Sequence, residues 1–576
     1  MVKNKHQIIQ DEKEYNLAIV ALIIVVSGFI IYCNALHASF AFDDHDAIIE
    51  NFAIRNNSLY TQFNQPRYIG LISFALNYHF NHFNTHGYHL VNILIHIINA
   101  LLVYLVIQSI LKINKTQSNG IYKREIPLVI SFIFLVHPIQ TQSVTYIVQR
   151  YTSLAALFTL VSIFFYLKFR SSRTRYYLFY ILSCIACLLA FKTKENTATL
   201  PLCIIAIEAL LFRNEKISRS RILHVFPYFL LIAVIPLSFI NMNQPLGKLI
   251  GGITEAASET TTITRTQYIF TEFRVMVIYM RLLVLPINQS IDYLIPLSQS
   301  FFEIKTFLAF CFLILILICA FLIAKRYPFI SLGIFWFFIF LAVESSVIPI
   351  SDVINEHRLY LPSIGFISMV VYSFFLAEKK SGSGKISFIF FAIIILALSA
   401  STYQRNKVWN NEISLWEDTA TKFPEDTRAW ENLGAAYMTK GMYTDAMKSL
   451  EKAIEINPQR ASQWFNLAMC HKALGLTENA VSELKIALEL NPQYQKPAIN
   501  LAIIYIEKKQ FNDAYDILIK AKNYAPTHPY INALLAQVYC EMGETDSAIS
   551  LFDKAMNNGL EYGDIYNNIS QCLSNK

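Results

Sequence analysis

Long apolar runs are the feature that most limits what this chain can fold into. They recur from the N-terminus to about residue 403 of the 576 residues, and only 15% of the chain is charged. A run of about 20 apolar residues can cross a bilayer as a helix, and a spanning segment must satisfy its own backbone hydrogen bonds, which favours helices. We predict eleven spans. They are 16–33, 88–111, 126–138, 152–168, 176–192, 197–212, 222–240, 305–323, 328–348, 359–377 and 386–403.

Basic clusters between the runs predict the topology. They lie in the N-terminal tail (Lys3, Lys5 and Lys13) and at 112–124, 168–175, 213–221, 325–326 and 379–385. Cytoplasmic loops carry an excess of Lys and Arg. With eleven spans and the N-terminus inside, every cluster is cytoplasmic and the C-terminal domain lies outside. We expect the first run to remain as an anchor, since no small-residue cleavage site follows it. The apolar stretches 68–80 and 269–285 would invert this pattern as spans, so we predict in-plane or re-entrant helices there.

A second kind of sequence follows the last run. Pro458, Pro492 and Pro526 recur every 34 residues, and small residues such as Ala446 and Ala480 keep the same register. This period is typical of tetratricopeptide repeats, in which each unit is a pair of helices. The sequence therefore predicts an all-α chain. Its parts are a polytopic membrane bundle over 1–403, a linker and half-repeat over 404–423, and an α-solenoid of about four repeats over 424–576.

The repeat array indicates a partner class but not an activity. Such solenoids present a concave surface that suits a protein or peptide, although a spacer or a dimerisation device remains an alternative. The net charge of +7 resides in short clusters between apolar runs, so we expect no nucleic-acid partner. The nine cysteines are scattered. Since Cys470, Cys540 and Cys572 lie in different repeats at no metal-like spacing, we predict neither a metal site nor a disulfide framework.

Polar motifs lie at the predicted outer ends of the spans, whereas the other turns carry simple Lys and Arg. These candidates are Asp43, Asp44, His89, Asn92, His96, His137, Arg150, Lys194, Glu195, Glu356, His357 and Arg358. Each group has a plain alternative. The acidic residues could form a solvated turn, and the polar stripe of the second span could pack against other helices.

The coincidence of these groups on one predicted side favours chemistry. A carboxylate can take the proton of an acceptor hydroxyl. Arginine grips phosphate through paired hydrogen bonds, and a cation stabilises phosphate as a leaving group. The set therefore indicates a site that binds an anionic lipid headgroup and activates a hydroxyl.

Extended motifs in the membrane half carry a family resemblance. They are FDDHDAIIEN (42–51), YHLVNILIH (88–96), LVHPIQTQSVTYIVQR (135–150), TKENTATLP (193–201), RLLVLPINQSIDY (281–293), SSVIPISDVINEHRLYLPSIGF (345–366) and RNKVWNNEISLW (405–416). With the repeats, they resemble the TMTC-type proteins (transmembrane and tetratricopeptide repeat) of the GT-C glycosyltransferase superfamily. The composition, rich in Ile, Asn and Lys, suggests a bacterial member.

The resemblance implies a GT-C-like bundle and a glycosyltransferase. It would move a mannose-like monosaccharide from a polyprenyl-phosphate carrier to an acceptor hydroxyl, such as Ser or Thr of a protein, on the outer or lumenal face. In this family the acidic pair is the catalytic signature, which implies that role for Asp43 and Asp44. By position, His357, Arg358, Arg150 and Lys194 would contact the donor phosphate.

The remaining candidates would support that site. They are Glu356, His137, His89, Asn92, His96 and Glu195. The resemblance implies no essential metal and no cofactor besides the lipid-linked donor. A bacterial member would lie in the inner membrane with its repeats in the periplasm; the alternative is the ER membrane with the repeats in the lumen.

Two other functions fit the same sequence. A membrane-anchored scaffold would use the repeats to recruit partners for an envelope complex and would not need the acidic pair. A polymerase or flippase for whole lipid-linked glycans would also use a helical bundle with a polar outer cavity.

Overall fold

The computed structural model describes residues 15–574, apart from 57–58, 60–62, 114–123, 173–175, 214, 216–218, 240–262, 346–348, 382–385 and 562. It contains two compact units, Met1–Leu415 and Trp416–Lys576. Every regular element in the described residues is a helix, so the all-α prediction is confirmed. The basic tail with Lys3, Lys5 and Lys13, and parts of the predicted cytoplasmic loops, lie outside the described residues.

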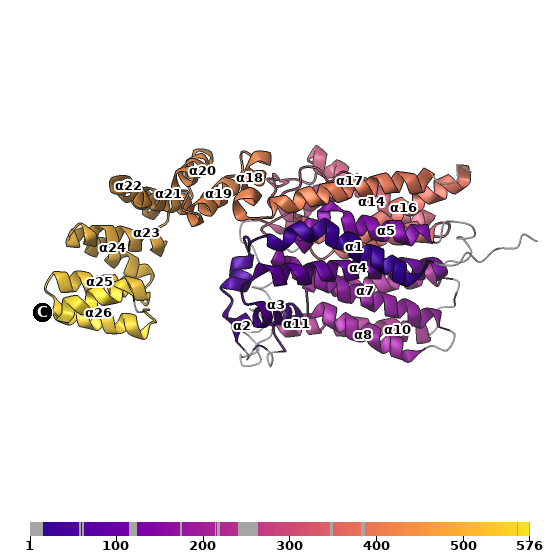
Figure 1. Ribbon diagram of the computed structural model, residues 1–576, viewed down its shortest axis with the longest axis horizontal. Helices are drawn as coiled ribbons and strands as arrows, with labels where there is room; N and C mark the ends of the chain where they lie inside the picture. The colour runs from indigo at the N-terminus through magenta and orange to yellow at the C-terminus, as the bar shows by residue number, and fades with distance from the viewer. Residues whose placement is uncertain are drawn as a thin grey trace, which may run out of the picture. The chain divides into compact units, whose positions relative to one another are not determined.

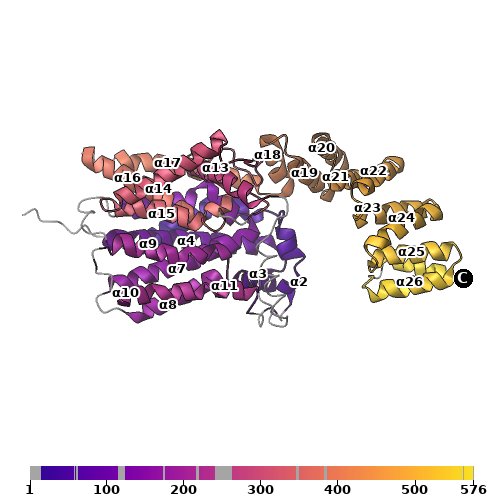
Figure 2. The same cartoon turned by 180° about the vertical axis from the view of Figure 1, so that it is seen from behind.

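The first unit is a bundle of long helices that lie side by side (Figure 1), with α9, α13 and α15 seen best from behind (Figure 2). Eleven of its helices occupy the predicted spans. They are α1 (Leu17–Tyr32), α4 (Thr85–Ile113), α5 (Glu125–Val136), α7 (Arg150–Ser171), α8 (Tyr177–Phe191), α9 (Leu200–Leu211), α10 (Arg219–Leu231), α14 (Ile304–Ile323), α15 (Pro328–Leu341), α16 (Pro362–Ser381) and α17 (Ile386–Val408).

The apolar helices make the chain a multi-pass membrane protein. Six helical segments in the described residues are long and apolar enough to cross a membrane by themselves. A seventh forms if α5 and the helices after its break are one span, bent by 51°. The apolar helices α8 and α15 are shorter. The count of eleven therefore stays a prediction.

Two further helices match the stretches that we excluded as spans. They are α3 (Tyr68–Asn81) and α13 (Arg265–Val284), and neither is both long and apolar enough to cross a membrane. The backbone N–H of Ile69 in α3 donates to the carbonyl of Lys192, 3.1 Å away. A Cβ atom on Gly70 would lie 2.2 Å from the ring of Tyr151 in α7. Close packing therefore holds α3 against the ends of α7 and α8.

The second unit is the repeat array. Its helix pairs are α19 (Thr427–Thr439) and α20 (Tyr443–Ile456), α21 (Ala461–Ala473) and α22 (Thr477–Leu490), α23 (Gln495–Glu507) and α24 (Phe511–Tyr524), and α25 (Pro529–Glu541) and α26 (Thr545–Asn557). The final helix is α27 (Asp564–Ser574), and α18 (Glu412–Lys422) joins the two units. The indole N–H groups of Trp430 and Trp464 donate to Pro424 and Pro458, each at 2.9 Å. Equivalent repeats thus use the same bond to fix each helix start.

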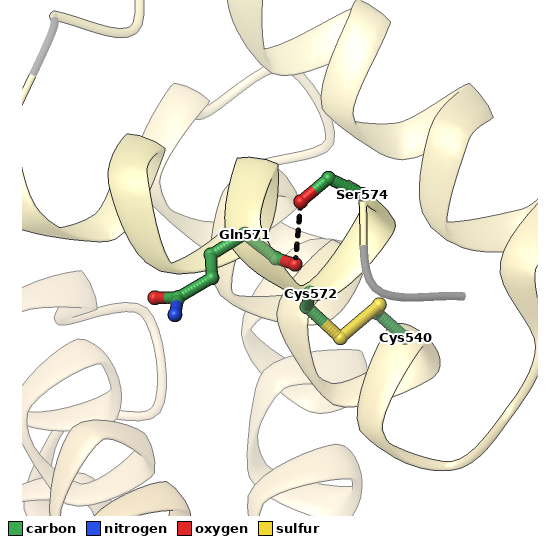
Figure 3. Close-up of a disulfide and its surroundings, with 4 residues drawn as sticks. All are labelled: Cys540, Gln571, Cys572 and Ser574. Carbon is green, nitrogen blue, oxygen red and sulfur yellow. Dashed lines mark hydrogen bonds between the residues drawn. A yellow bond between two sulfur atoms is a disulfide. The ribbon is translucent and has the colours of Figure 1, made fainter.

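A disulfide joins Cys540 on α25 to Cys572 on α27 (Figure 3). The prediction that the chain has no disulfide was therefore wrong. The two cysteines belong to different helices, and only the packing of α27 against α25 brings them together. Sequence spacing carries no signal for such a contact. The bond fastens the last helix, which caps the core of the array.

The turn between the two helices of each repeat requires a left-handed backbone. Gly441, Gly475 and Gly543 have φ of 71°, 78° and 89° at equivalent positions, and Lys509 has φ of 58° in the third repeat. A residue with a Cβ pays about 1 kcal/mol or more in this conformation. The third repeat is therefore strained at Lys509.

Lys509→Gly should raise the unfolding temperature of the array in the full-length protein, because glycine adopts this conformation freely. The expected gain is about 1 kcal/mol, measured by calorimetry in detergent. Gly475→Lys, the reverse change in the preceding repeat, should lower the transition by a similar amount. A lower transition for Lys509→Gly would contradict this account of the turn.

Candidate functional site

The two aspartates of the acidic pair after α1 lie in different environments. Asp44 is 1% exposed, and its Oδ1 and Oδ2 accept the backbone N–H groups of Val148 and Ala41 at 2.7 and 3.1 Å. Asp43 is exposed. Its backbone N–H donates to the hydroxyl of Tyr146 at 2.9 Å. Asp44 therefore anchors the loop to the chain before α7, while Asp43 is exposed and its side chain interacts with Tyr146.

The environment of Asp44 also affects its charge. Burial raises the pKa of this carboxyl to about 8, although the N–H groups of Ala41 and Val148 lower it in part and the charge of Asp43 raises it further. An ordinary aspartate titrates near pH 4. The native loop thus holds a proton on Asp44 at neutral pH, whereas an exposed carboxylate like that of Asp43 is the better candidate for a base.

Arg150 lies inside the bundle and is fully committed to protein groups. Its guanidinium donates to Asn92 Oδ1 at 2.6 Å and to the carbonyls of Ser73 and Tyr88 at 3.1 and 3.0 Å. The ring of Phe74 lies 4.5 Å from it, and Arg150 has no exposed surface. This geometry favours a clip between α3, α4 and α7 over the phosphate contact that we predicted.

Three of the predicted supporting residues form hydrogen bonds with backbone carbonyls of neighbouring segments. Asn92 Nδ2 donates to the carbonyls of Val144 and Ile147, each at 3.2 Å. His89 Nε2 donates to the carbonyl of Ala38 at 3.0 Å. His96 contacts the carbonyl of Leu135 through Nε2 and the hydroxyl of Tyr360 through Nδ1. The polar stripe of α4 therefore packs against protein, as its plain alternative required.

His137, Glu356 and Glu195 also fasten loops. His137 Nε2 donates to the carbonyl of Leu283, and its Nδ1 accepts the N–H of Ile139 after the end of α5. Glu356 is 1% exposed, and its carboxylate accepts three hydrogen bonds from the loop after α13. The donors are Gln289 Nε2, the N–H of Ser290 and the Tyr293 hydroxyl. Glu195 accepts Arg67 Nε at 3.1 Å.

Lys194, His357 and Arg358 form a cationic cluster with two buried glutamates. Lys194 Nζ lies 3.0 Å from Glu344 Oε1, and Arg358 Nη1 lies 3.7 Å from Glu272 Oε1. Arg358 also donates to the carbonyls of Asp352 and Val353. Its guanidinium is therefore held by the protein on several sides, and Lys194 Nζ also donates to Thr152 Oγ1 at 2.9 Å.

His357 is the least satisfied member of the cluster. Its Nδ1 atom is buried and has no hydrogen-bond partner in the described part of the chain. Burial lowers the pKa of the imidazole well below its usual value, and the positive charges of Lys194 and Arg358 lower it further. A neutral imidazole beside two cations can accept a proton or donate a hydrogen bond to an anion that enters there.

One short segment ties the acidic loop to this cluster. The side chain of Gln142 in α6 (Thr141–Val144) accepts the backbone N–H of His357 at 2.6 Å. Tyr146, four residues later, holds the N–H of Asp43. α6 ends at Val144, and Tyr146 follows two residues later, so both attachments belong to one short stretch of chain. The structure thus brings Asp43 and His357 to the same end of the bundle.

An apolar cavity of about 280 Å³ lies among α13, α14, α15 and α16. Its lining includes Met280 of α13, Leu315 and Cys319 of α14, and Phe337 and Phe366 of α15 and α16. Glu272 and Tyr268 lie on α13 as well, and Tyr268 donates to the carbonyl of Glu344 at 2.6 Å. One helix therefore contributes both to an apolar cavity and to the cationic cluster.

Sequence reasoning missed several residues that shape this region. Tyr146 and Glu344 lie in polar motifs but were assigned no role, and Glu272 is a single acidic residue in the apolar stretch 269–285. An acidic residue inside α9 also pairs with the basic residues at the opposite helix ends, and no role was assigned to it from the sequence. There, Glu208 pairs with Arg170 at 2.6 Å and with Arg221, and a counter-charge inside the span at 197–212 was the available signal.

Comparisons with known proteins find relatives for most of the chain. Two family models, both described as tetratricopeptide repeat, match residues 427–460 and 471–538. A Caenorhabditis elegans protein named Protein O-mannosyl-transferase F38B6.6 is 26% identical over 78% of this chain and 64% of its own length. Protein O-mannosyl-transferase TMTC3 of mouse is 25% identical, and that of human 24%, over 74% of this chain.

The matched region spans 64% of the worm protein and 50% of the mouse and human proteins. It includes most of this chain, so the predicted resemblance to TMTC-type proteins is confirmed. The repeat array is likewise confirmed by the two family models.

Substitution of the buried Asp44 should destabilise the protein more than substitution of the exposed Asp43. Asp44→Ala leaves the N–H groups of Ala41 and Val148 without their acceptor and should cost about 2 kcal/mol or more, whereas Asp43→Ala should cost much less. Because the native state retains the Asp44 proton, its contribution to stability should decline as pH rises from about 4 to about 8, and Asp44→Ala should remove that slope. Thermal unfolding in detergent across this pH range measures both. Equal losses in the two variants would overturn the distinction.

Proposed function

We propose that this chain, a relative of the TMTC-type protein O-mannosyl-transferases, is a membrane glycosyltransferase. It moves a mannose-like hexose from a polyprenyl-phosphate carrier to a Ser or Thr hydroxyl of a protein. The observation that carries the proposal is the attachment of both the exposed Asp43 loop and the His357 cluster to residues 142–146. A base and a phosphate-binding group must lie close to each other to act on one bond.

In this proposal Asp43 is the general base. The acceptor hydroxyl oxygen attacks the anomeric carbon, and its proton passes to the Asp43 carboxylate. The bond between the anomeric carbon and the phosphate oxygen breaks, and the electron pair leaves with polyprenyl phosphate. Asp44 positions the base through the backbone, Tyr146 does so through both the N–H and the side chain of Asp43, and neither touches the substrate.

The donor phosphate would enter beside His357 and Lys194. The buried, unpartnered Nδ1 of His357 offers a hydrogen bond, and the Lys194 ammonium offers charge that is now balanced by Glu344. The wholly apolar cavity among α13, α14, α15 and α16 suits the prenyl chain, which needs no polar partner. Arg358 would contribute charge from a fixed position.

The disulfide supports an outer position for the repeats. Disulfides persist in oxidising compartments such as the bacterial periplasm and the ER lumen. The bond between Cys540 and Cys572 therefore agrees with the side that the charge pattern predicts for the array. We propose that the array binds the acceptor or a partner protein there, in the periplasm if the chain is bacterial or in the ER lumen otherwise.

Asp43→Asn should abolish transfer of hexose to a Ser- or Thr-containing peptide, because the amide cannot take the proton. The assay uses the purified full-length protein, polyprenyl-phosphate mannose and mass spectrometry of the peptide. Asp46→Asn is the matched control, since Asp46 is an exposed acid three residues along the same loop, and it should keep full activity. Full activity in Asp43→Asn would instead favour the scaffold, whose function should be lost on deletion of 424–576.

His357→Ala should weaken binding of the polyprenyl donor more than binding of the acceptor peptide. Loss of one hydrogen bond to a charged phosphate costs about 1.5–3 kcal/mol, which corresponds to a rise of roughly tenfold or more in the KM for the polyprenyl donor. The KM for the peptide should change little. His89→Ala is a useful comparison because His89 contacts the backbone of the first loop. A donor KM unchanged in His357→Ala would remove this residue from the phosphate site.

A further inference from the structure

The last turns of α17 and the residues that follow it lie against the chain that carries Asp43. The N–H of Ser39 donates to the carbonyl of Asn410 at 3.0 Å, and Asn34 Nδ2 donates to the carbonyl of Tyr403 at 2.8 Å. Asn406 is fully buried. It accepts a hydrogen bond from the hydroxyl of Thr145 and donates one to the carbonyl of Ile31. Residues 403–410 therefore contact the chain both before the acidic pair and beside Tyr146.

Glu412 holds the backbone immediately before Asp43. Its Oε1 accepts the N–H of Phe42 at 3.0 Å and lies 3.4 Å from His45 Nε2. Phe42 has φ of 49°, a left-handed conformation that a residue with a bulky side chain rarely adopts;. Such a conformation persists only where surrounding contacts impose it. The bond from Glu412 is one of those contacts.

Trp409 packs against Tyr146, which binds the next residue, Asp43. The two rings stack with centroids 5.2 Å apart, and Trp409 is 2% exposed. The Tyr146 hydroxyl in turn accepts the N–H of Asp43. Glu412 thus binds the N–H of Phe42 directly. Trp409 supports the N–H of Asp43 through Tyr146.

We propose that Trp409 and Glu412 are positioning residues that clamp the Asp43 base. This inference rests on the proposed function and specifies how its base is controlled. Glu412 is the first residue of α18, and that helix continues across the boundary at Leu415 into the repeat unit. The helix that enters the repeats therefore begins with a residue that fixes the catalytic loop. An acceptor or partner that reorients α18 would alter the position of the base.

Glu412→Ala and Glu412→Gln test the clamp. Alanine removes the acceptor for the Phe42 N–H, whereas glutamine retains a carbonyl oxygen there. A hydrogen bond of about 1.4 kcal/mol corresponds to a tenfold change. Glu412→Ala should therefore exchange the backbone amides of 40–46 about tenfold faster and lower kcat about tenfold, with the donor KM unchanged. Glu412→Gln should stay near wild type in both measurements.

Two further variants make the result specific. Glu417→Ala removes a carboxylate on the same helix that accepts the hydroxyl of Tyr437 in the repeat unit, and it should leave exchange in 40–46 unchanged. Tyr146→Phe keeps the ring against Trp409 but removes the acceptor for the Asp43 N–H, so it should lower kcat as Glu412→Ala does.

The outcomes separate this inference from the proposed function. Unchanged exchange in Glu412→Ala would overturn the clamp, as would equal kcat losses in Glu412→Ala and Glu412→Gln. Faster exchange with wild-type kcat would also overturn it, while leaving the role of Asp43 intact. A wild-type protein that transfers no sugar would refute the proposed function instead, and the exchange data would still report whether Glu412 holds the loop.

Discussion

The arrangement of the bundle depends on one constraint: a helix that breaks within a membrane protein must still satisfy its backbone groups inside the protein. The bundle meets this constraint with buried polar side chains. Asp44 accepts the N–H of Val148, Asn92 donates to Val144 and Ile147, and Glu356 accepts the N–H of Ser290. These bonds fix the broken segments between spans, and the broken segments in turn form the end of the bundle where Asp43 lies.

This constraint explains why so few of the polar residues are free for chemistry. Arg150, His96 and His137 resemble catalytic groups in sequence, yet each is occupied by carbonyls or amides of the protein. By contrast, Asp43 is exposed, His357 has a buried Nδ1 without a partner in the described residues, and Lys194 carries a charge that Glu344 balances. A rigid, satisfied scaffold around a small reactive set is the arrangement that preorganised catalysis needs.

The sequence predicted the helices well because their signals are local. Apolar runs located the helices of the bundle, and the recurrence of Pro458, Pro492 and Pro526 located the repeats. The charge pattern led us to expect these motifs at one end, and Asp43 and His357 do attach to one short stretch of chain. It could not distinguish Asp43 from Asp44, because exposure depends on the contact with Val148, 104 residues away. The same limit hid the Cys540–Cys572 bond and the grip of Glu412 on Phe42.

The base, the phosphate-binding cluster and the start of α18 together describe a transferase whose catalytic loop is held by the helix that enters its repeats. The most direct measurement is mass spectrometry of exported proteins from cells that carry either the wild-type chain or Asp43→Asn at equal abundance. The account predicts single hexoses on Ser or Thr of specific proteins with the wild-type chain and their loss with the variant. Identical glycosylation in both cells would contradict it.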